Sequence, residues 1–228
     1  MKKLPKGIRA ALFDMDGVLL DSMPMHARCW KESMSLFGIN MPEIETFQIE
    51  GMRGLDICKM MALRELHREV SEEEAQKMYD AKSKAVEASP QPVTMPGVKH
   101  LMEQMKRDGL KIVVVTGSGH RSLLDDLQRR FPGLIDPQLM VTSYDVENGK
   151  PHPEPYLRGM EKAGTTPEET IVVENAPLGV RSAKAAGAFT IAVNTGPLPA
   201  ETLLNEGADM LFEKMTDLDE QWDAINGK

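Results

Sequence analysis

Five short apolar runs most constrain how this chain can fold, because each is too short to form a stable helix. They are continuous and rich in β-branched residues, a pattern typical of strands that are buried on both faces of a sheet. Helical patterns separate the later runs, and such alternation predicts an α/β fold with a parallel sheet and right-handed crossover connections. The runs occupy residues 10–13, 112–115, 139–141, 171–173 and 191–193.

The interval between the first two runs breaks this rhythm. It contains several helical stripes of apolar residues and no convincing strand run. Ser71 and Glu74 form a capping-box pattern, which indicates the start of a helix, and a proline-rich stretch follows at residues 90–96. We therefore expect an inserted all-helical domain at residues 22–95, with the α/β core formed by residues 1–21 and 96–228.

Composition excludes several functional classes. The 228 residues are 41% apolar and 27% charged, as in ordinary globular proteins, and 27 basic against 35 acidic residues make nucleic acid an unfavourable partner. No apolar run approaches ~18 residues, so we expect neither a membrane span nor an export signal. The two cysteines, Cys29 and Cys58, lack CxxC spacing, which favours a reducing cytoplasmic location. Oligomeric state is left open by the sequence.

Reactive side chains follow three of the predicted strands at the point where each run ends. Asp14 follows the first run, Thr116 the second, and Glu174 with Asn175 the fourth. In an open parallel sheet the carboxyl ends of the strands form the ligand crevice. The sequence therefore predicts that these side chains converge on one site.

The first two of these segments can be interpreted chemically. The Asp-Met-Asp-Gly turn at residues 14–17 carries two carboxylates, of which one could attack or bind metal while the other transfers a proton. A plain Asp-rich turn is the alternative. The Thr-Gly-Ser-Gly segment at residues 116–119 offers hydroxyl and N–H groups at a helix start, including those of Gly117 and Ser118. Such groups suit a phosphate, although a glycine-serine turn alone is weak evidence.

Two later segments supply further candidates. Lys150 lies between Gly149 and a proline-rich stretch that restricts where its ammonium group can point, although an exposed loop lysine is the simpler interpretation. Glu174 and Asn175 offer the oxygen ligands that Mg²⁺ prefers, and a helix cap by Asn175 is the alternative.

These motifs occur along the chain in the order Asp14-x-Asp16-Gly17, Thr116, Lys150 and Glu174-Asn175. In this order they resemble the four motifs of the haloacid dehalogenase superfamily, and the match spans nearly the whole chain. The insertion after the first motif resembles the superfamily's helical-bundle cap, and residues 14–26 are similar to its β-phosphoglucomutase-like branch. The resemblance implies a Rossmann-like core with an inserted all-helical cap, and Mg²⁺-dependent phosphoryl transfer through an aspartyl-phosphate.

The resemblance also implies a role for each motif. Asp14 is the nucleophile, and Asp16 protonates the leaving oxygen and later activates water. Thr116 and Lys150 hold the transferring phosphoryl oxygens, while Asp14, the Asp16 carbonyl group and Asn175 bind Mg²⁺. Phosphoryl transfer depends mainly on positioning and charge neutralisation, which these roles provide. The oxygen ligands do not rank Mg²⁺ against Mn²⁺.

Two departures from the family pattern bear on the substrate. Members commonly carry an acidic residue where Asn175 stands, and phosphoglucomutases place a basic, hydroxyl-bearing cap loop where this chain has Glu50 and Arg53. One explanation is that Glu50 supplies the missing carboxylate to the metal, directly or through water, when the cap closes. The substrate must then be small, such as pyrophosphate, with Arg53 or Lys150 contacting its far end. Solvated surface charges are the alternative interpretation for Glu50 and Arg53.

The cap also contributes His26, which could form hydrogen bonds near the site entrance or simply pack within the cap. This combination resembles bacterial inorganic pyrophosphatases of the same branch, so pyrophosphate is the substrate we expect first. A β-phosphoglucomutase and a small sugar-phosphate phosphatase remain alternatives. A descendant that only binds its ligand is disfavoured, because Asp14, Asp16, Thr116 and Lys150 are all present.

Overall fold

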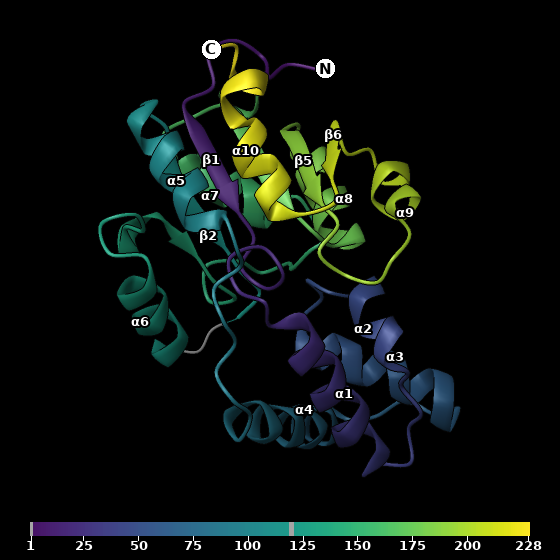
Figure 1. Cartoon of the computed structure of the whole chain (residues 1–228). Helices are drawn as coiled ribbons and strands as arrows, with labels where there is room; N and C mark the ends of the chain where they lie inside the picture. The colour runs from purple at the N-terminus through teal and green to yellow at the C-terminus, as the bar shows by residue number, and fades with distance from the viewer. Residues whose placement is uncertain (1, 119–120) are drawn as a thin grey trace.

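The computed structural model describes residues 2–118 and 121–228, with only the backbone described at residues 121–124. These residues form a parallel sheet of six strands in the order β3-β2-β1-β4-β5-β6, with helices on both faces (Figure 1). Its central strand β1 pairs with β2 and β4, which brings the ends of these three strands together. The strands are β1 (Ala10–Phe13), β2 (Lys111–Val115), β3 (Met140–Val141), β4 (Thr170–Glu174), β5 (Phe189–Val193) and β6 (Met210–Phe212).

Alternate side chains of the strands enter two separate cores, which explains why the runs are apolar throughout. On one face, Ala11 and Phe13 of β1 pack in a cluster with residues of α5 and α10. On the other face, Ala10 and Leu12 pack with residues of α7 and with Ala183 of α8. The core helices are α5 (Val98–Arg107), α6 (Arg121–Arg130), α7 (Glu154–Ala163), α8 (Pro177–Ala185), α9 (Ala200–Asn205) and α10 (Met215–Asn226), with short 3₁₀ turns at Pro137–Leu139 and Pro167–Glu169.

Four helices between β1 and α5 form a separate cap below the sheet in Figure 1. Helix α1 packs against α2 and α4, and α3 packs against α4. Their apolar faces enclose a core of their own around Trp30, Met34 and Met61. The expected capping box is present at the start of α4, where Ser71 and Glu74 exchange hydrogen bonds. The cap helices are α1 (Met23–Ser35), α2 (Glu43–Gln48), α3 (Gly54–Leu66) and α4 (Glu72–Glu87).

The two connections between core and cap run side by side. Leu20 forms an antiparallel bridge with Thr94, and the Asp21 N–H donates to the Val93 carbonyl oxygen at 2.9 Å. Arg130 at the end of α6 donates to the carbonyl oxygen of Pro92 in the return connection at 2.7 Å. The cap is therefore attached through two paired connecting segments, one of which also contacts α6.

The predicted fold class, an α/β parallel-sheet core with an all-helical insertion, is confirmed. Strand β6 was missed, because Met210–Phe212 is a three-residue strand with no β-branched residue. In the described part of the chain, no helix combines the length and apolar character needed to cross a membrane.

Candidate active site

Asp14 directly follows the central strand and is almost fully buried. Its N–H donates to the Val173 carbonyl oxygen at 3.1 Å, so the ladder between β1 and β4 continues into the site. The turn then passes through Gly17 at φ +81°, where an added Cβ would lie 2.0 Å from the Asn175 amide nitrogen. Only glycine permits this approach, which brings the loops after β1 and β4 into contact.

Lys150 lies in the loop before α7, yet its side chain is only 3% exposed, so the interpretation as an exposed loop lysine is wrong. Its Nζ is 2.5 Å from Asp14 Oδ1 and 2.7 Å from Glu174 Oε1. Burial acts to lower the pKa of Lys150, but the two carboxylates outweigh it and raise that pKa well above its usual range. The two carboxylates therefore favour the charged form of the ammonium group beside Asp14.

The electrostatics of Asp14 reflect its burial. Desolvation raises the pKa of Asp14 to about 7, Lys150 opposes this rise, and Glu174 and Asp16 add to it. Its Oδ1 accepts the Lys150 hydrogen bond, whereas Oδ2 is buried without a partner. A cation or a phosphorus atom could reach that second oxygen without breaking an existing bond.

Asp16 has a different environment, which joins core and cap. Its Oδ1 accepts from Ser22 Oγ at 2.5 Å and lies 3.2 Å from His26 Nε2. Lys82 of α4 lies 3.1 Å from His26 Nδ1, so a donating ammonium group leaves the His26 proton on Nε2, facing Asp16. Burial acts to raise the pKa of Asp16, but His26 and Ser22 outweigh it, and the pKa is lowered.

The end of β2 supplies the predicted hydroxyl and N–H groups. Thr116 is buried, and its Oγ1 accepts from the Ser118 N–H at 3.0 Å, which fixes the start of the loop. Gly117 and Ser118 line the same cavity as Asp14 and Asp16. Gly119 lies outside the described residues.

Glu50 reaches the site from the cap, just beyond the end of α2. Its Oε2 accepts from Asn175 Nδ2 at 3.4 Å, and its Oε1 is buried without a partner. Burial, together with Asp14, Glu174 and Asp16, raises the pKa of Glu50 well above its usual range. The next residue, Gly51 at φ +91°, lies so close to Lys150 that an added Cβ would be 2.9 Å from Lys150 Cδ. The structure therefore has the cap loop closed over the core.

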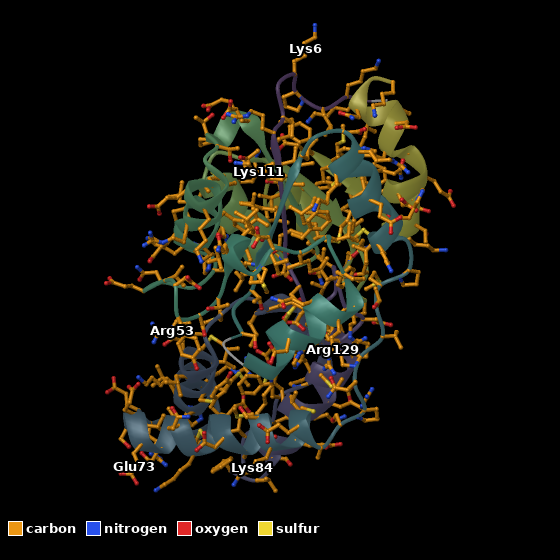
Figure 2. All side chains as sticks on the ribbon, turned by 90° about the vertical axis from the view of Figure 1, so that its left-hand side faces the viewer. Lys6, Arg53, Glu73, Lys84, Lys111 and Arg129 are labelled. Carbon is orange, nitrogen blue, oxygen red and sulfur yellow. The ribbon has the colours of Figure 1, made fainter. Side chains whose placement is uncertain are left out.

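Arg53 does not join this group. Its guanidinium group donates to the Glu147 carbonyl oxygen at 2.9 Å and lies 3.5 Å from Asp56, and the side chain is 48% exposed (Figure 2). It fastens the cap loop to a core loop and does not line the cavity that contains Asp14. The sequence could not distinguish an arginine that contacts the substrate from one that attaches the cap loop to the core, because both roles use a basic residue beside a glycine.

The cavity between cap and core has a volume of about 470 Å³. Lys82 and Thr46 are among the lining residues that sequence reasoning missed, and the Thr46 hydroxyl is buried without a partner. Lys82 is half-buried at the edge of the cavity, with its Nζ 5.3 Å from the centroid of the Trp30 ring. On an amphipathic helix such a lysine resembles a solvent-facing one, so no sequence signal identified it.

The unpartnered oxygens provide a test for a divalent cation. Asp14 Oδ2, Glu50 Oε1 and Asn175 Oδ1 are all buried without hydrogen-bond partners. Within the described ranges, no three His, Cys, Asp or Glu side chains form a metal-binding group. The candidate donors instead combine two carboxylates with an amide oxygen, a hard-oxygen set that fits Mg²⁺.

Comparisons with known proteins identify the family of the chain. Residues 11–193 match the family of haloacid dehalogenase-like hydrolases, and the chain belongs to that family. It is 31% identical to hexitol phosphatase A of Escherichia coli, over 90% of each chain. Its relatives further identify it as a phosphatase or phosphomutase of the β-phosphoglucomutase-like branch.

Two further relatives have names that point to different substrates. A solved structure from Bacteroides vulgatus, provisionally named a β-phosphoglucomutase, is 46% identical with a TM-score of 0.92, and covers 96% of this chain and 88% of that chain. A protein from Caldanaerobacter subterraneus, provisionally named a pyrophosphatase, is 27% identical over 92% of this chain and 93% of its own length. The relatives therefore agree on phosphate chemistry and differ in substrate.

Proposed function

We propose that this chain is a Mg²⁺-dependent inorganic pyrophosphatase that works through an aspartyl-phosphate on Asp14. The observation that carries the proposal is the position of Glu50, a cap carboxylate buried beside Asn175 with one unpartnered oxygen. A second negative charge so close to Asp14 is costly unless a cation is shared between them. We infer that cap closure and metal binding are one event, and that a metal held by both cap and core suits a small, highly charged substrate.

In the first step, a carboxylate oxygen of Asp14 attacks phosphorus, and the bond from phosphorus to the bridging oxygen breaks. Lys150 and the groups of Thr116, Gly117 and Ser118 hold the phosphoryl oxygens during this transfer. When bound, Mg²⁺ would be held by Asp14, the Asp16 carbonyl group, Asn175 and Glu50, and would neutralise charge on the phosphoryl group.

In the second step, Asp16 accepts a proton from water as the water oxygen attacks phosphorus and the bond from phosphorus to the Asp14 oxygen breaks. This releases Asp14 and orthophosphate, and Asp16 then passes its proton to a departing phosphate. The lowered pKa of Asp16, in which His26 and Ser22 outweigh the effect of burial, keeps the carboxylate ionised and so able to accept a proton. It is less suited to protonating a departing alkoxide. Phosphate is a better leaving group than a sugar alkoxide, so this environment also supports pyrophosphate.

The cavity favours a second candidate function. Its volume of about 470 Å³, with Trp30, Ile57 and Tyr79 in the lining, exceeds what pyrophosphate needs. Such a space suits an organic phosphate, as the name of the E. coli hexitol phosphatase indicates for that protein. A mutase must also hold a second phosphate, for which the family uses a basic cap loop, and the corresponding loop here places Glu50 in the cavity and Arg53 outside it.

The test is orthophosphate release with Mg²⁺ from pyrophosphate, phenyl phosphate and a panel of hexose and hexitol phosphates. We expect kcat/KM to be highest for pyrophosphate. Glu50→Ala should reduce that value by about 100-fold and hydrolysis of phenyl phosphate far less, because only the closed cap brings Glu50 to the metal. Glu73→Ala is the matched control, since Glu73 is exposed at the far end of the cap (Figure 2).

Three results would contradict the proposal. Preferred hydrolysis of a hexose or hexitol phosphate would favour the second candidate function. Conversion of β-glucose 1-phosphate to glucose 6-phosphate without orthophosphate release would identify a mutase. Equal losses on pyrophosphate and phenyl phosphate in Glu50→Ala would remove Glu50 from the specificity argument.

A further inference from the structure

Glu174, at the end of β4, is fully buried and already saturated with donors from the chain itself. Its Oε1 accepts from Lys150 Nζ at 2.7 Å and from the Tyr156 hydroxyl at 2.8 Å. Its Oε2 accepts from the N–H groups of Asn175 at 2.8 Å and Ala176 at 3.0 Å. A carboxylate offers about four lone-pair sites, and these four donors occupy them. Glu174 therefore supports its neighbours and has no lone pair to offer a metal or a substrate.

Tyr156 is the least expected member of this group. It lies on α7, its side chain is fully buried, and its ring centroid is 5.0 Å from Lys150 Nζ. Burial and the neighbouring Glu174 raise the pKa of Tyr156 well above its usual range, so the hydroxyl remains a donor. The same side chain thus contacts Lys150 through its ring and Glu174 through its hydroxyl.

The carboxylate of Glu174 also has no room to turn away. Gly179, in helix α8, approaches so closely that an added Cβ would lie 1.7 Å from Glu174 Oε1. The backbone donors at Asn175 and Ala176 fix the other oxygen. Tyr156 is therefore the one side-chain hydroxyl, among the described residues, that shares Oε1 with Lys150.

Lys150 has three N–H donors to distribute. One donates to Asp14 at 2.5 Å and one to Glu174 at 2.7 Å, while the carbonyl oxygen of Val115 is a weak partner at 3.5 Å. The third donor can therefore turn to an oxygen of the transferring phosphoryl group. An unshared Oε1 on Glu174 would attract the ammonium group more strongly and draw it away from Asp14.

We propose that Tyr156 is a positioning residue for phosphoryl transfer. By sharing Glu174 Oε1, its hydroxyl keeps the Lys150 ammonium group between Glu174 and Asp14, with one N–H available to the phosphoryl group. The inference rests on the proposed roles of Asp14 and Lys150 and is independent of which phosphate is the substrate.

The test is Tyr156→Phe, which retains the ring and removes the hydroxyl. We expect kcat to fall by about tenfold and the inhibition constant of orthovanadate, a mimic of the transferring group, to rise by about the same factor. Partial unfolding would lower the active fraction and the apparent kcat but would leave the inhibition constant unchanged. Tyr144→Phe is the matched control, because Tyr144 is 83% exposed.

A double variant tests the route of the effect. If Tyr156 acts through Glu174, then adding Tyr156→Phe to Glu174→Gln should cause no further rise in the inhibition constant. Fully additive effects would overturn the inference, as would a Tyr156→Phe enzyme with unchanged kcat and inhibition constant. Lys150→Ala, measured in parallel, separates the two proposals: if it retains activity, the proposed chemistry itself fails.

Discussion

The core half and the cap half of the site differ in how completely their polar groups are paired. In the core, Lys150 contacts both Asp14 and Glu174, and every oxygen of Glu174 has a donor. In the cap, Glu50 has a single contact of 3.4 Å and one unpartnered oxygen, and the Thr46 hydroxyl has no partner. Asp14 Oδ2 and Asn175 Oδ1 of the core are also without partners, but the Asp14 carboxylate is already held by Lys150, whereas Glu50 has only its contact at 3.4 Å. The core side chains are therefore positioned before a ligand arrives, and the cap carboxylate is not.

This difference assigns phosphoryl transfer to the core and the choice of substrate to the cap. A prearranged set of charges accelerates transfer because no reorganisation is needed at the moment of reaction. Groups that complete their bonds only when a ligand is present make the reaction depend on what the closed cavity contains. Core substitutions should therefore affect all substrates alike, and cap substitutions should affect them unequally.

The largest effect is expected for Asp14→Asn. The amide cannot form the aspartyl-phosphate, so turnover should fall by more than about 10³-fold on every phosphate tested. Orthophosphate release measures the loss, and circular dichroism with thermal unfolding verifies that the variant is folded. Substantial turnover by a folded Asp14→Asn enzyme would remove Asp14 as the nucleophile.

The same division explains how much the sequence could predict. The strand-end residues of the core were identifiable, because buried runs predict a parallel sheet and the ends of its strands must converge. Lys150 was harder, since its burial depends on the fold of its loop and on carboxylates 24 and 136 residues away along the chain.

The cap side was less accessible to sequence reasoning. Arg53 was expected near the substrate, yet it binds a core carbonyl group, and Lys82 was not identified at all. Both positions depend on how two separately packed units meet, which local periodicity does not encode. Tyr156 was also missed, because the sequence does not distinguish a tyrosine that packs in the hydrophobic core from one whose hydroxyl contacts a buried carboxylate.

Gly51→Ala should have the next largest effect on activity, and it tests whether a change in the cap affects substrates unequally. The added methyl group would meet Lys150 Cδ at 2.9 Å and prevent full closure, so kcat/KM for pyrophosphate should fall by about tenfold. Phenyl phosphate hydrolysis should fall less, because its transfer needs only the core groups. Steady-state kinetics on both substrates measure the difference.

Gly38→Ala provides the matched control for this prediction. Gly38 is also in the cap, at φ +72°, but an added Cβ there meets nothing within 4 Å. Both alanines should therefore lower the free energy of unfolding by about 1 kcal/mol through backbone strain. Only Gly51→Ala should lower activity, and equal activity in the two variants would mean that closure does not require contact between Gly51 and Lys150.

The smallest effect concerns stability and pH. Burial and then Asp14 raise the pKa of Glu50 well above its ordinary value of 4.5. The contribution of Glu50 to the free energy of unfolding is therefore fully present below pH 4.5. It is lost as the pH rises through the raised pKa of the folded state. Glu50→Gln cannot ionise, so without metal its Tm should match that of the natural protein near pH 4.5.

Near pH 8 without metal, Glu50→Gln should then melt higher by a few degrees, since about 1 kcal/mol corresponds to roughly 2–4 °C in a chain of this size. Saturating Mg²⁺ should reverse the sign, because the cation stabilises the ionised carboxylate that glutamine lacks. Glu73→Gln, in an exposed position, controls for loss of a surface charge. A Tm difference that is the same at every pH, with or without Mg²⁺, would mean that Glu50 is solvated and that the cap stands open in solution.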